Sequence, residues 1–187
     1  MKIAILALQG AFAEHEQMLR QLGCDTFLIR CLDDWKQSKD GLVIPGGEST
    51  AMMRILQDEG LMEPIRQAIL QGLPVFGTCA GMILLDDAHL HTMDISVRRN
   101  AYGRQLGSFY TEGHFEGVDQ MIPMTFIRAP YITRVGQGCK LLSVVDGNMV
   151  AAQQENQLVT SFHPELNQDT RVHSYFLEMI RKSQLAI

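Results

Sequence analysis

The sequence has no long apolar segment, no cluster of basic residues and no closely spaced cysteines, and each absence excludes a class of protein. The apolar run near the N-terminus, residues 3–8, has six residues, whereas a membrane-spanning helix needs ~20. The 16 Lys and Arg residues against 21 Asp and Glu residues give a formal net charge of −5, so no basic patch for nucleic acid is present. We therefore expect neither a membrane nor a nucleic acid as a partner, and favour a small polar substrate.

The four cysteines are scattered along the chain. No pair has C-x-x-C spacing, which argues against a zinc ribbon or a redox dithiol. We expect free thiols in a reducing cytoplasm, with no metal and no cofactor. The cysteines are Cys24, Cys31, Cys79 and Cys139.

The N-terminus resembles a secretory signal in one respect, because residues 11–13 have the A-x-A pattern of a cleavage site. Six apolar residues are nevertheless fewer than the roughly 7 to 15 of a signal's apolar region. The run also ends at Gly10, as a strand ends at a turn. We expect a buried first strand here.

The first half of the chain alternates short apolar runs with amphipathic helical stretches, which is typical of a parallel sheet covered by crossover helices. At 187 residues the chain fits a single domain, residues 1–187. Strands are expected at residues 3–8, 26–30, 42–44 and 74–76, and helices at 11–22, 61–70 and 82–85. A further helix containing residues 52–56 is expected to be capped by Ser49 or Thr50.

From about residue 95 the pattern changes to short β-like runs that should extend or flank the sheet, antiparallel in part. The turn residues Asp146-Gly147-Asn148 predict a hairpin between two of these runs. The runs are residues 108–110, 125–127, 141–145, 149–152 and 158–162, followed by a last helix at 170–182.

Residues 77–81, GTCAG, lie between an apolar strand and a helix, the context in which G-x-S-x-G forms a nucleophile elbow. The glycines permit the sharp turn, since a Cβ there would collide with neighbouring backbone. A helix N-terminus also stabilises negative charge. Cys79 is therefore the candidate nucleophile, and the other three cysteines are expected to be packing residues.

A cysteine nucleophile needs a base and the base needs an orienting partner. An apolar strand leads into His163-Pro164-Glu165, and the residue before a proline is biased toward extended geometry. In extended chain residues i and i+2 project to the same side, so His163 and Glu165 are expected to face Cys79 together. The other histidines have no spacing that suggests a metal and are treated as surface or structural: His15, His89, His91, His114 and His173.

The loop at residues 45–50, PGGEST, follows a strand at the edge of the sheet where loops of parallel sheets converge on ligands. Acyl transfer requires donors for an oxyanion, and we propose the backbone N–H groups of Gly47 and Ala80. A phosphate loop is the weaker alternative, because no G-K-[S/T] follows.

Together, GTCAG, PGGEST and residues 161–166, SFHPEL, resemble the class I glutamine amidotransferases. The resemblance implies a flavodoxin-like α/β fold with a mixed, mostly parallel central sheet flanked by helices. It also implies a catalytic triad of Cys79, His163 and Glu165.

One branch of that family is similar over nearly the whole chain, the glutaminase subunits of pyridoxal 5′-phosphate synthases. Residues 98–105, RRNAYGRQ, and 126–130, FIRAP, add to the resemblance. Two departures concern the pocket wall: residues 86–96 form a shorter stretch than expected for this branch, and Ala101-Tyr102 replaces Ser-Phe.

Glutamine's α-ammonium requires an acid, and its α-carboxylate requires a cation or N–H groups. A surface ion pair remains an equal alternative for Arg99 and for Arg128. The resemblance assigns the glutamine pocket to Gly46, Gly47, Glu48, Ser49, Arg99, Ile127 and Arg128, with Gln9 beside the oxyanion loop.

The implied activity is hydrolysis of L-glutamine to glutamate and ammonia, with the ammonia passed to the pyridoxal 5′-phosphate synthase subunit. A 187-residue domain has no room for a second, synthetic active site, so a separate synthase partner is expected. Three alternatives remain open: the glutaminase subunit of imidazole glycerol phosphate synthase, a catalytically silent scaffold on the same fold, and a γ-glutamyl peptidase.

Overall fold

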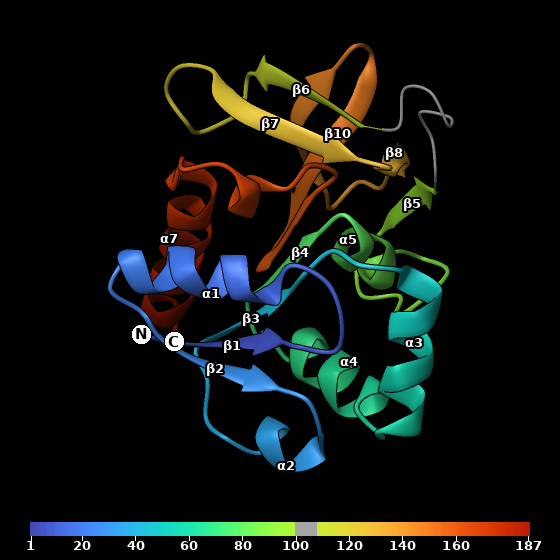
Figure 1. The fold of residues 1–187 in the computed structure, drawn as a ribbon, viewed down its shortest axis with the longest axis vertical. Coiled ribbons are helices and arrows are strands. Elements are labelled where there is room, and N and C mark those ends of the chain that lie inside the picture. Colours follow the sequence, from blue (N-terminus) through green and yellow to red (C-terminus); the bar gives the residue numbers. More distant parts are fainter. Residues whose placement is uncertain (100–107) are drawn as a thin grey trace.

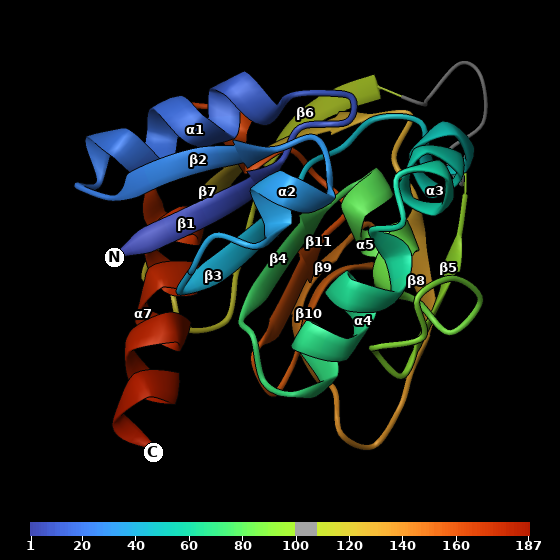
Figure 2. The same ribbon diagram turned by 90° about the horizontal axis from the view of Figure 1, so that it is seen from below.

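The computed structural model describes residues 1–99 and 108–187, which form an α/β fold around a central sheet (Figures 1 and 2). Within the described residues nine strands form this sheet in the order β2-β1-β3-β4-β11-β10-β8-β5, with β9 paired to β10. The strands are β1 (Lys2–Leu6), β2 (Asp25–Ile29), β3 (Gly41–Ile44), β4 (Val75–Thr78), β5 (Ile95–Arg98), β8 (Tyr131–Val135), β9 (Lys140–Val145), β10 (Asn148–Gln154) and β11 (Gln157–Thr160).

Helices cover both faces of the sheet, with α1 and α7 on one face and α3, α4 and α5 on the other (Figure 2). Each face buries its own apolar cluster. The helices are α1 (Phe12–Gln21), α2 (Leu32–Trp35), α3 (Ser49–Asp58), α4 (Met62–Leu70), α5 (Ala80–Leu85), the 3-10 turn η1 (Pro164–Leu166) and α7 (Arg171–Leu185). A separate ribbon of β6 (Ser108–Gly113) and β7 (Ile122–Ile127) packs over the α7 side (Figure 1).

The five strands β2, β1, β3, β4 and β11 run parallel, and β10, β9, β8 and β5 add antiparallel pairs. The expected mixed sheet with flanking helices is therefore confirmed. The hairpin turn is also present, since Asp146 and Gly147 have φ values of 50° and 79° between β9 and β10. That residues 1–187 form a single domain remains a prediction.

Four neighbouring parallel strands position the loops that matter for function. The loops after β1, β3, β4 and β11 leave the same carboxyl edge, and these strands are adjacent in the sheet. They carry Gln9, Gly47, Cys79 and His163 respectively. Residues distant in the sequence are thereby brought together at one edge.

Some elements differ from the sequence prediction. The first strand ends at Leu6 rather than at residue 8, and the predictions did not include α2, β5 or β8. The cap of α3 is Glu48, whose carboxylate accepts hydrogen bonds from the N–H groups of Thr50 and Ala51, so Ser49 and Thr50 belong to the helix. A glutamate carboxylate reaches the free N–H groups of the first turn as a shorter cap side chain does.

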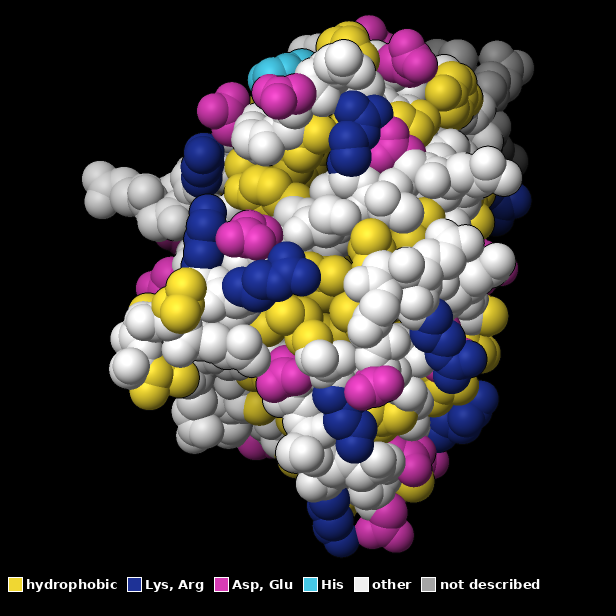
Figure 3. Space-filling view, turned by 90° about the vertical axis from the view of Figure 1, so that its left-hand side faces the viewer, with side chains coloured by type: hydrophobic (Ala, Val, Ile, Leu, Met, Phe, Trp, Pro, Cys, Tyr) yellow, Lys and Arg dark blue, Asp and Glu magenta, His cyan; other side chains and the backbone are white. Residues whose placement is uncertain are grey.

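Positive and negative side chains are interspersed on the face that carries α7 and the chain ends (Figure 3). This face therefore has no large field of a single sign. Among the described residues, no helix combines the length and apolar character required to cross a membrane.

Candidate active site

Cys79 occupies a strained turn between β4 and α5. Its backbone has φ 52° and ψ −106°, a region that residues with a side chain rarely adopt. A Cβ on Gly77 would lie 2.6 Å from the Gly81 carbonyl oxygen, and a Cβ on Gly81 would lie 2.0 Å from that of Ile44. Both glycines are therefore required by close backbone approach, and together they allow the elbow that points the Cys79 side chain out of the sheet edge.

His163 lies between the Cys79 thiol and the Glu165 carboxylate. Its Nδ1 is 2.6 Å from Glu165 Oε1, and the ring also hydrogen-bonds with the Cys79 side chain. Because Nδ1 is occupied by the carboxylate, the bond to Cys79 uses Nε2. The exposed fractions of the three residues are only 7%, 7% and 5% for Cys79, His163 and Glu165.

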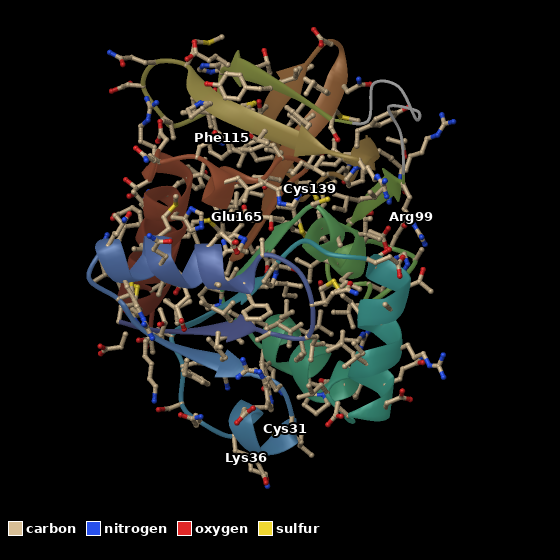
Figure 4. All side chains as sticks on the ribbon, viewed as in Figure 1. Cys31, Lys36, Arg99, Phe115, Cys139 and Glu165 are labelled. Carbon is tan, nitrogen blue, oxygen red and sulfur yellow. The ribbon has the colours of Figure 1, made fainter. Side chains whose placement is uncertain are left out.

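Glu165 does not face Cys79 beside His163, as extended geometry had predicted. Pro164 opens the short 3-10 turn η1, which rotates Glu165 out of the alternation of a strand. The carboxylate consequently lies behind the imidazole, on the side away from Cys79. Figure 4 shows Glu165 in the interior, where α1 approaches the C-terminal part of the chain.

The pKa values of the two groups favour an ion pair. Burial lowers the pKa of His163, but hydrogen bonds to Cys79 and Glu165 outweigh it and raise the value to about 10. Burial raises the pKa of Glu165, but the facing His15 and the hydrogen bond from His163 hold it below its usual range. The imidazole is therefore able to hold its proton while the carboxylate remains charged.

The Gly46-Gly47 loop packs directly against this pair. A Cβ on Gly46 would lie 2.5 Å from His163 Cε1 and 3.3 Å from Cys79 Cβ, so only glycine fits there. On its other side the loop meets the segment that follows β1, because a Cβ on Gly10 would lie 1.6 Å from the Gly46 carbonyl oxygen. Gln9 Oε1 accepts the Glu48 N–H at 2.6 Å and so joins the loop to the segment that follows β1.

A cavity of about 550 Å³ opens in front of Cys79. A larger cavity of about 750 Å³ lies beside α7, but its lining contains no cysteine or histidine, so we assign the site to the smaller one. The predicted residues that line the smaller cavity are Gly46, Gly47, Glu48, Ser49, Cys79, Ala80, Arg99, Ile127, Arg128 and His163. Gln9 and Glu165 support these residues from behind.

The charged residues of the cavity wall contact one another. Arg99 Nη2 lies 3.5 Å from Glu48 Oε1, and Arg99 Nη1 donates to Thr50 Oγ1 at 3.2 Å. The ion pair considered for Arg99 is thus present at the cavity itself. Arg128 has φ 45°, and the carbonyl of the preceding Ile127 lies 4.0 Å from Cys79 Sγ. Residues 100–105 of the RRNAYGRQ segment, with Ala101 and Tyr102, lie outside the described residues.

Two histidines behind Glu165 were missed as part of the site. His15 and His173 are fully buried, and His15 Nε2 lies 3.4 Å from Glu165 Oε2. A surface position for either is therefore wrong. The sequence did contain one indication that His15 is buried. His15 lies three and four residues before Met18 and Leu19, which places all three on the buried face of α1.

His89, His114 and Cys24 lie away from this site. His89 pairs with Asp86 at 2.7 Å, and the exposed His114 lies 3.6 Å from Glu116. Cys24 packs in the apolar cluster under α1 and α7. All four thiols are free, and among the described residues no group of three potential ligands could hold a metal ion.

Comparison with known proteins identifies the family. The model of the SNO glutamine amidotransferase family matches residues 5–182. The chain is 56% identical over 192 residues to "Pyridoxal 5'-phosphate synthase subunit PdxT" of Streptococcus pneumoniae strain D39, covering 97% of this chain and 99% of that protein. The protein of the same name from strain CGSP14 is 56% identical over 194 residues, covering 98% and 100%.

Solved structures agree with this match. A structure described as a glutamine amidotransferase superposes with a TM-score of 0.89 at 36% identity, covering 95% of this chain and 98% of the other. PurLQS from Thermotoga maritima shares the fold, with a TM-score of 0.68 at 14% identity and coverage of 99% and 97%. The chain therefore belongs to the SNO glutamine amidotransferase family and is an enzyme that hydrolyses glutamine.

Proposed function

We propose that this chain is the glutaminase subunit of a pyridoxal 5′-phosphate synthase and that Cys79, His163 and Glu165 carry its chemistry. The observation that carries the proposal is the strained Cys79 elbow, hydrogen-bonded to an imidazole whose other nitrogen contacts a buried carboxylate. Relatives with 56% identity along essentially the whole chain bear the name of that synthase. This favours the pyridoxal 5′-phosphate branch over imidazole glycerol phosphate synthase.

In the first half-reaction the Cys79 thiol gives its proton to His163 and Sγ attacks the side-chain amide carbon of glutamine, so that the carbonyl electron pair moves onto oxygen. The N–H groups of Gly47 and Ala80 donate hydrogen bonds to this oxyanion. Ala80 is the first residue of α5, so its N–H has no acceptor within the helix. His163 then protonates the amide nitrogen, the C–N bond breaks, and ammonia leaves a thioester on Cys79.

In the second half-reaction His163 takes a proton from water as the oxygen attacks the thioester carbon. The C–S bond breaks, glutamate is released and the Cys79 sulfur is regenerated. Glu165 acts throughout as the group that holds the His163 ring and stabilises its protonated form. A scaffold without catalysis would have no need of this buried charge pair.

The charged residues of the cavity wall suit the two ends of free glutamine. Glu48 accepts N–H groups of Ala51 and Thr50, which lower the pKa of its carboxyl and keep it negative for the α-ammonium group. Arg99 and Arg128 supply positive charge for the α-carboxylate. Ser49, Ile127 and Gly46 form the rest of the wall, and Gln9 holds the loop.

The ammonia requires an acceptor close by, because in open solution it is protonated and lost as a nucleophile. The family resemblance implies that the acceptor is the pyridoxal 5′-phosphate synthase subunit. We further place the protein in the cytoplasm, which agrees with four free thiols.

We expect the synthase subunit to raise the glutaminase rate of this chain by about 100-fold, which requires only ~2.7 kcal/mol of differential binding. The physical reason is the Gly46-Gly47 peptide, which flips at low steric cost, so the orientation that serves the oxyanion is a minor population without the partner. The measurement is initial glutamate formation at saturating glutamine, titrated with purified synthase subunit, beside size-exclusion chromatography for the complex.

Two results would contradict this expectation: an isolated chain that is already maximally active, or a synthase that binds without changing the rate. A parallel assay with a γ-glutamyl peptide tests the peptidase alternative. Turnover of the peptide in preference to free glutamine would replace the proposed function.

A further inference from the structure

Two buried imidazoles continue the line of polar groups behind Glu165. His15 comes from α1 and His173 from α7, and both have no exposed surface. Their rings are surrounded by apolar groups, with the Phe76 ring 6.0 Å from the ring of His15 and 5.4 Å from that of His173. Polar rings in such surroundings are costly unless they are hydrogen-bonded.

Oε2, the second carboxylate oxygen of Glu165, is the atom of the proposed triad that faces the buried His15. His163 occupies Oε1, whereas buried Oε2 has no hydrogen-bond partner of standard geometry among the described residues. The polar atom that faces Oε2 is His15 Nε2, at 3.4 Å, and the same nitrogen lies 3.2 Å from Thr78 Oγ1. A nitrogen lone pair facing a carboxylate would be repelled, so His15 Nε2 carries the proton.

This assignment fixes the proton on the second histidine. Burial lowers the pKa of His15 and lowers that of His173 well below its usual range, so each ring is neutral and has one N–H. With Nε2 of His15 protonated, its Nδ1 is an acceptor, and His173 Nε2 donates to it at 2.8 Å. His173 Nδ1 is then a lone pair without a partner rather than a buried N–H without one, which agrees with its unsatisfied state.

His15 Nε2 is hydrogen-bonded to Thr78 Oγ1 at 3.2 Å and lies 3.4 Å from Glu165 Oε2. The chain from His173 through His15 therefore places a protonated nitrogen close to one carboxylate oxygen, while His163 bonds the other. The charged or titratable groups that act on His15 are Glu165, His163, Glu14 and His173. A carboxylate held at one oxygen rotates about its terminal bond, whereas one held at both oxygens is fixed in its plane. Fixing the plane of Glu165 fixes the ring of His163, and with it the Nε2 that faces Cys79.

We propose that His15 is a positioning residue of the glutaminase, which holds Oε2 of Glu165 while His173 sets its tautomer. This inference rests on the proposed catalytic roles of His163 and Glu165. The competing view is that the two histidines only fill the core beneath α1 and α7. The two views differ in whether a hydrogen-bond donor, rather than an imidazole shape, is required at position 15.

The first experiment compares His15→Leu with His15→Gln in the full chain assayed with its synthase subunit. Glutamine places its amide N–H near the position of histidine Nε2, whereas leucine fills space and donates nothing. We expect His15→Leu to lower kcat by about 10-fold to 100-fold, the usual cost of losing a supporting residue, with KM within about 2-fold. His15→Gln should retain kcat within about 3-fold, and the exposed His114→Gln serves as the matched control.

The pH profile separates positioning from packing. In His15→Leu the plane of Glu165 is no longer fixed and its Oε1 contact with His163 Nδ1 weakens, so the pKa of His163 falls and the alkaline limb of kcat/KM moves to lower pH. Equal losses of kcat in the leucine and glutamine variants, or an unmoved alkaline limb in His15→Leu, would overturn the proposal. Thermal unfolding of each variant shows how much of any loss is due to destabilisation.

A second measurement does not depend on variants that fold or on activity. Ring ¹⁵N chemical shifts of the wild-type protein report the tautomer of each buried histidine. We expect His15 and His173 to be neutral and protonated at Nε2. A proton on Nδ1 of His15 would overturn the proposal even if the enzyme is active, whereas a wild-type protein without glutaminase activity but with these tautomers would overturn only the proposed function.

Discussion

Cys79→Ala abolishes glutamate release from glutamine, with an expected loss of at least ~10³-fold, as for other covalent nucleophiles. Among the described residues that line the cavity, the Cys79 thiol alone is placed on a strained elbow and hydrogen-bonded to His163, so none of them replaces it as the nucleophile. Removing one sulfur leaves the backbone of the turn intact. The measurement is steady-state glutamate formation in the presence of the synthase subunit.

The other cysteines provide the control for this result. Cys31→Ala changes a half-buried thiol outside the cavity and is expected to leave the rate within about 2-fold. Retained glutaminase activity in Cys79→Ala would contradict the mechanism in which Cys79 is the nucleophile. An equal loss in a Cys24, Cys31 or Cys139 variant would show that the nucleophile has been assigned to the wrong residue.

His163→Asn is expected to lose about as much activity as Cys79→Ala, and Glu165→Gln roughly 10²-fold less. Asparagine removes the imidazole that, in the proposed mechanism, transfers protons between Cys79, the leaving nitrogen and water. Glutamine at position 165 still accepts the Nδ1–H bond with its amide oxygen, which holds the ring but stabilises the imidazolium less. Steady-state kinetics on both variants tests the order, and a larger loss for Glu165→Gln would require a different base.

The same pair of variants has a pH signature. Because the pKa of His163 is raised to about 10 by Cys79 and Glu165, wild-type kcat/KM should fall only as the pH rises through that value. Glu165→Gln removes the negative charge that favours the imidazolium, so the alkaline limb should move to lower pH. An unchanged limb would mean that Glu165 does not act on His163.

The sequence predicted those parts of the site that depend on local rules. Gly77 and Gly81 flank a cysteine between an apolar strand and a helix, a local pattern that predicts the elbow, although the backbone that excludes a Cβ at Gly81 is that of Ile44 on the neighbouring β3. Parallel strands that end at one edge then brought Gly47, Cys79 and His163 together without further information. The other residues of the glutamine pocket were assigned from the family resemblance, and two of them lie outside the parallel strands, since Arg99 directly follows β5 and Ile127 ends β7.

What was missed depends on contacts between distant segments. His15 on α1 and His173 on α7 are 158 residues apart in the chain, and only the packing of both helices on one face of the sheet brings them together. Strands β5 and β8 are short and pair with each other at the end of the sheet, where burial is partial and the apolar pattern is weak. The position of Glu165 was wrong because Pro164 begins a 3-10 turn, which overrides strand alternation.

The central claim is that Cys79 forms a covalent bond to the side-chain carbon of glutamine, and trapping that bond is its most direct test. A glutamine analogue whose side-chain amide is replaced by a diazomethyl ketone places an electrophilic carbon next to Cys79 Sγ. We expect one adduct per chain, located on the peptide that contains Cys79 by mass spectrometry, and formation of this adduct should be slowed by competing glutamine. An adduct on Cys24, Cys31 or Cys139 instead, or no adduct in the active complex, would contradict the account.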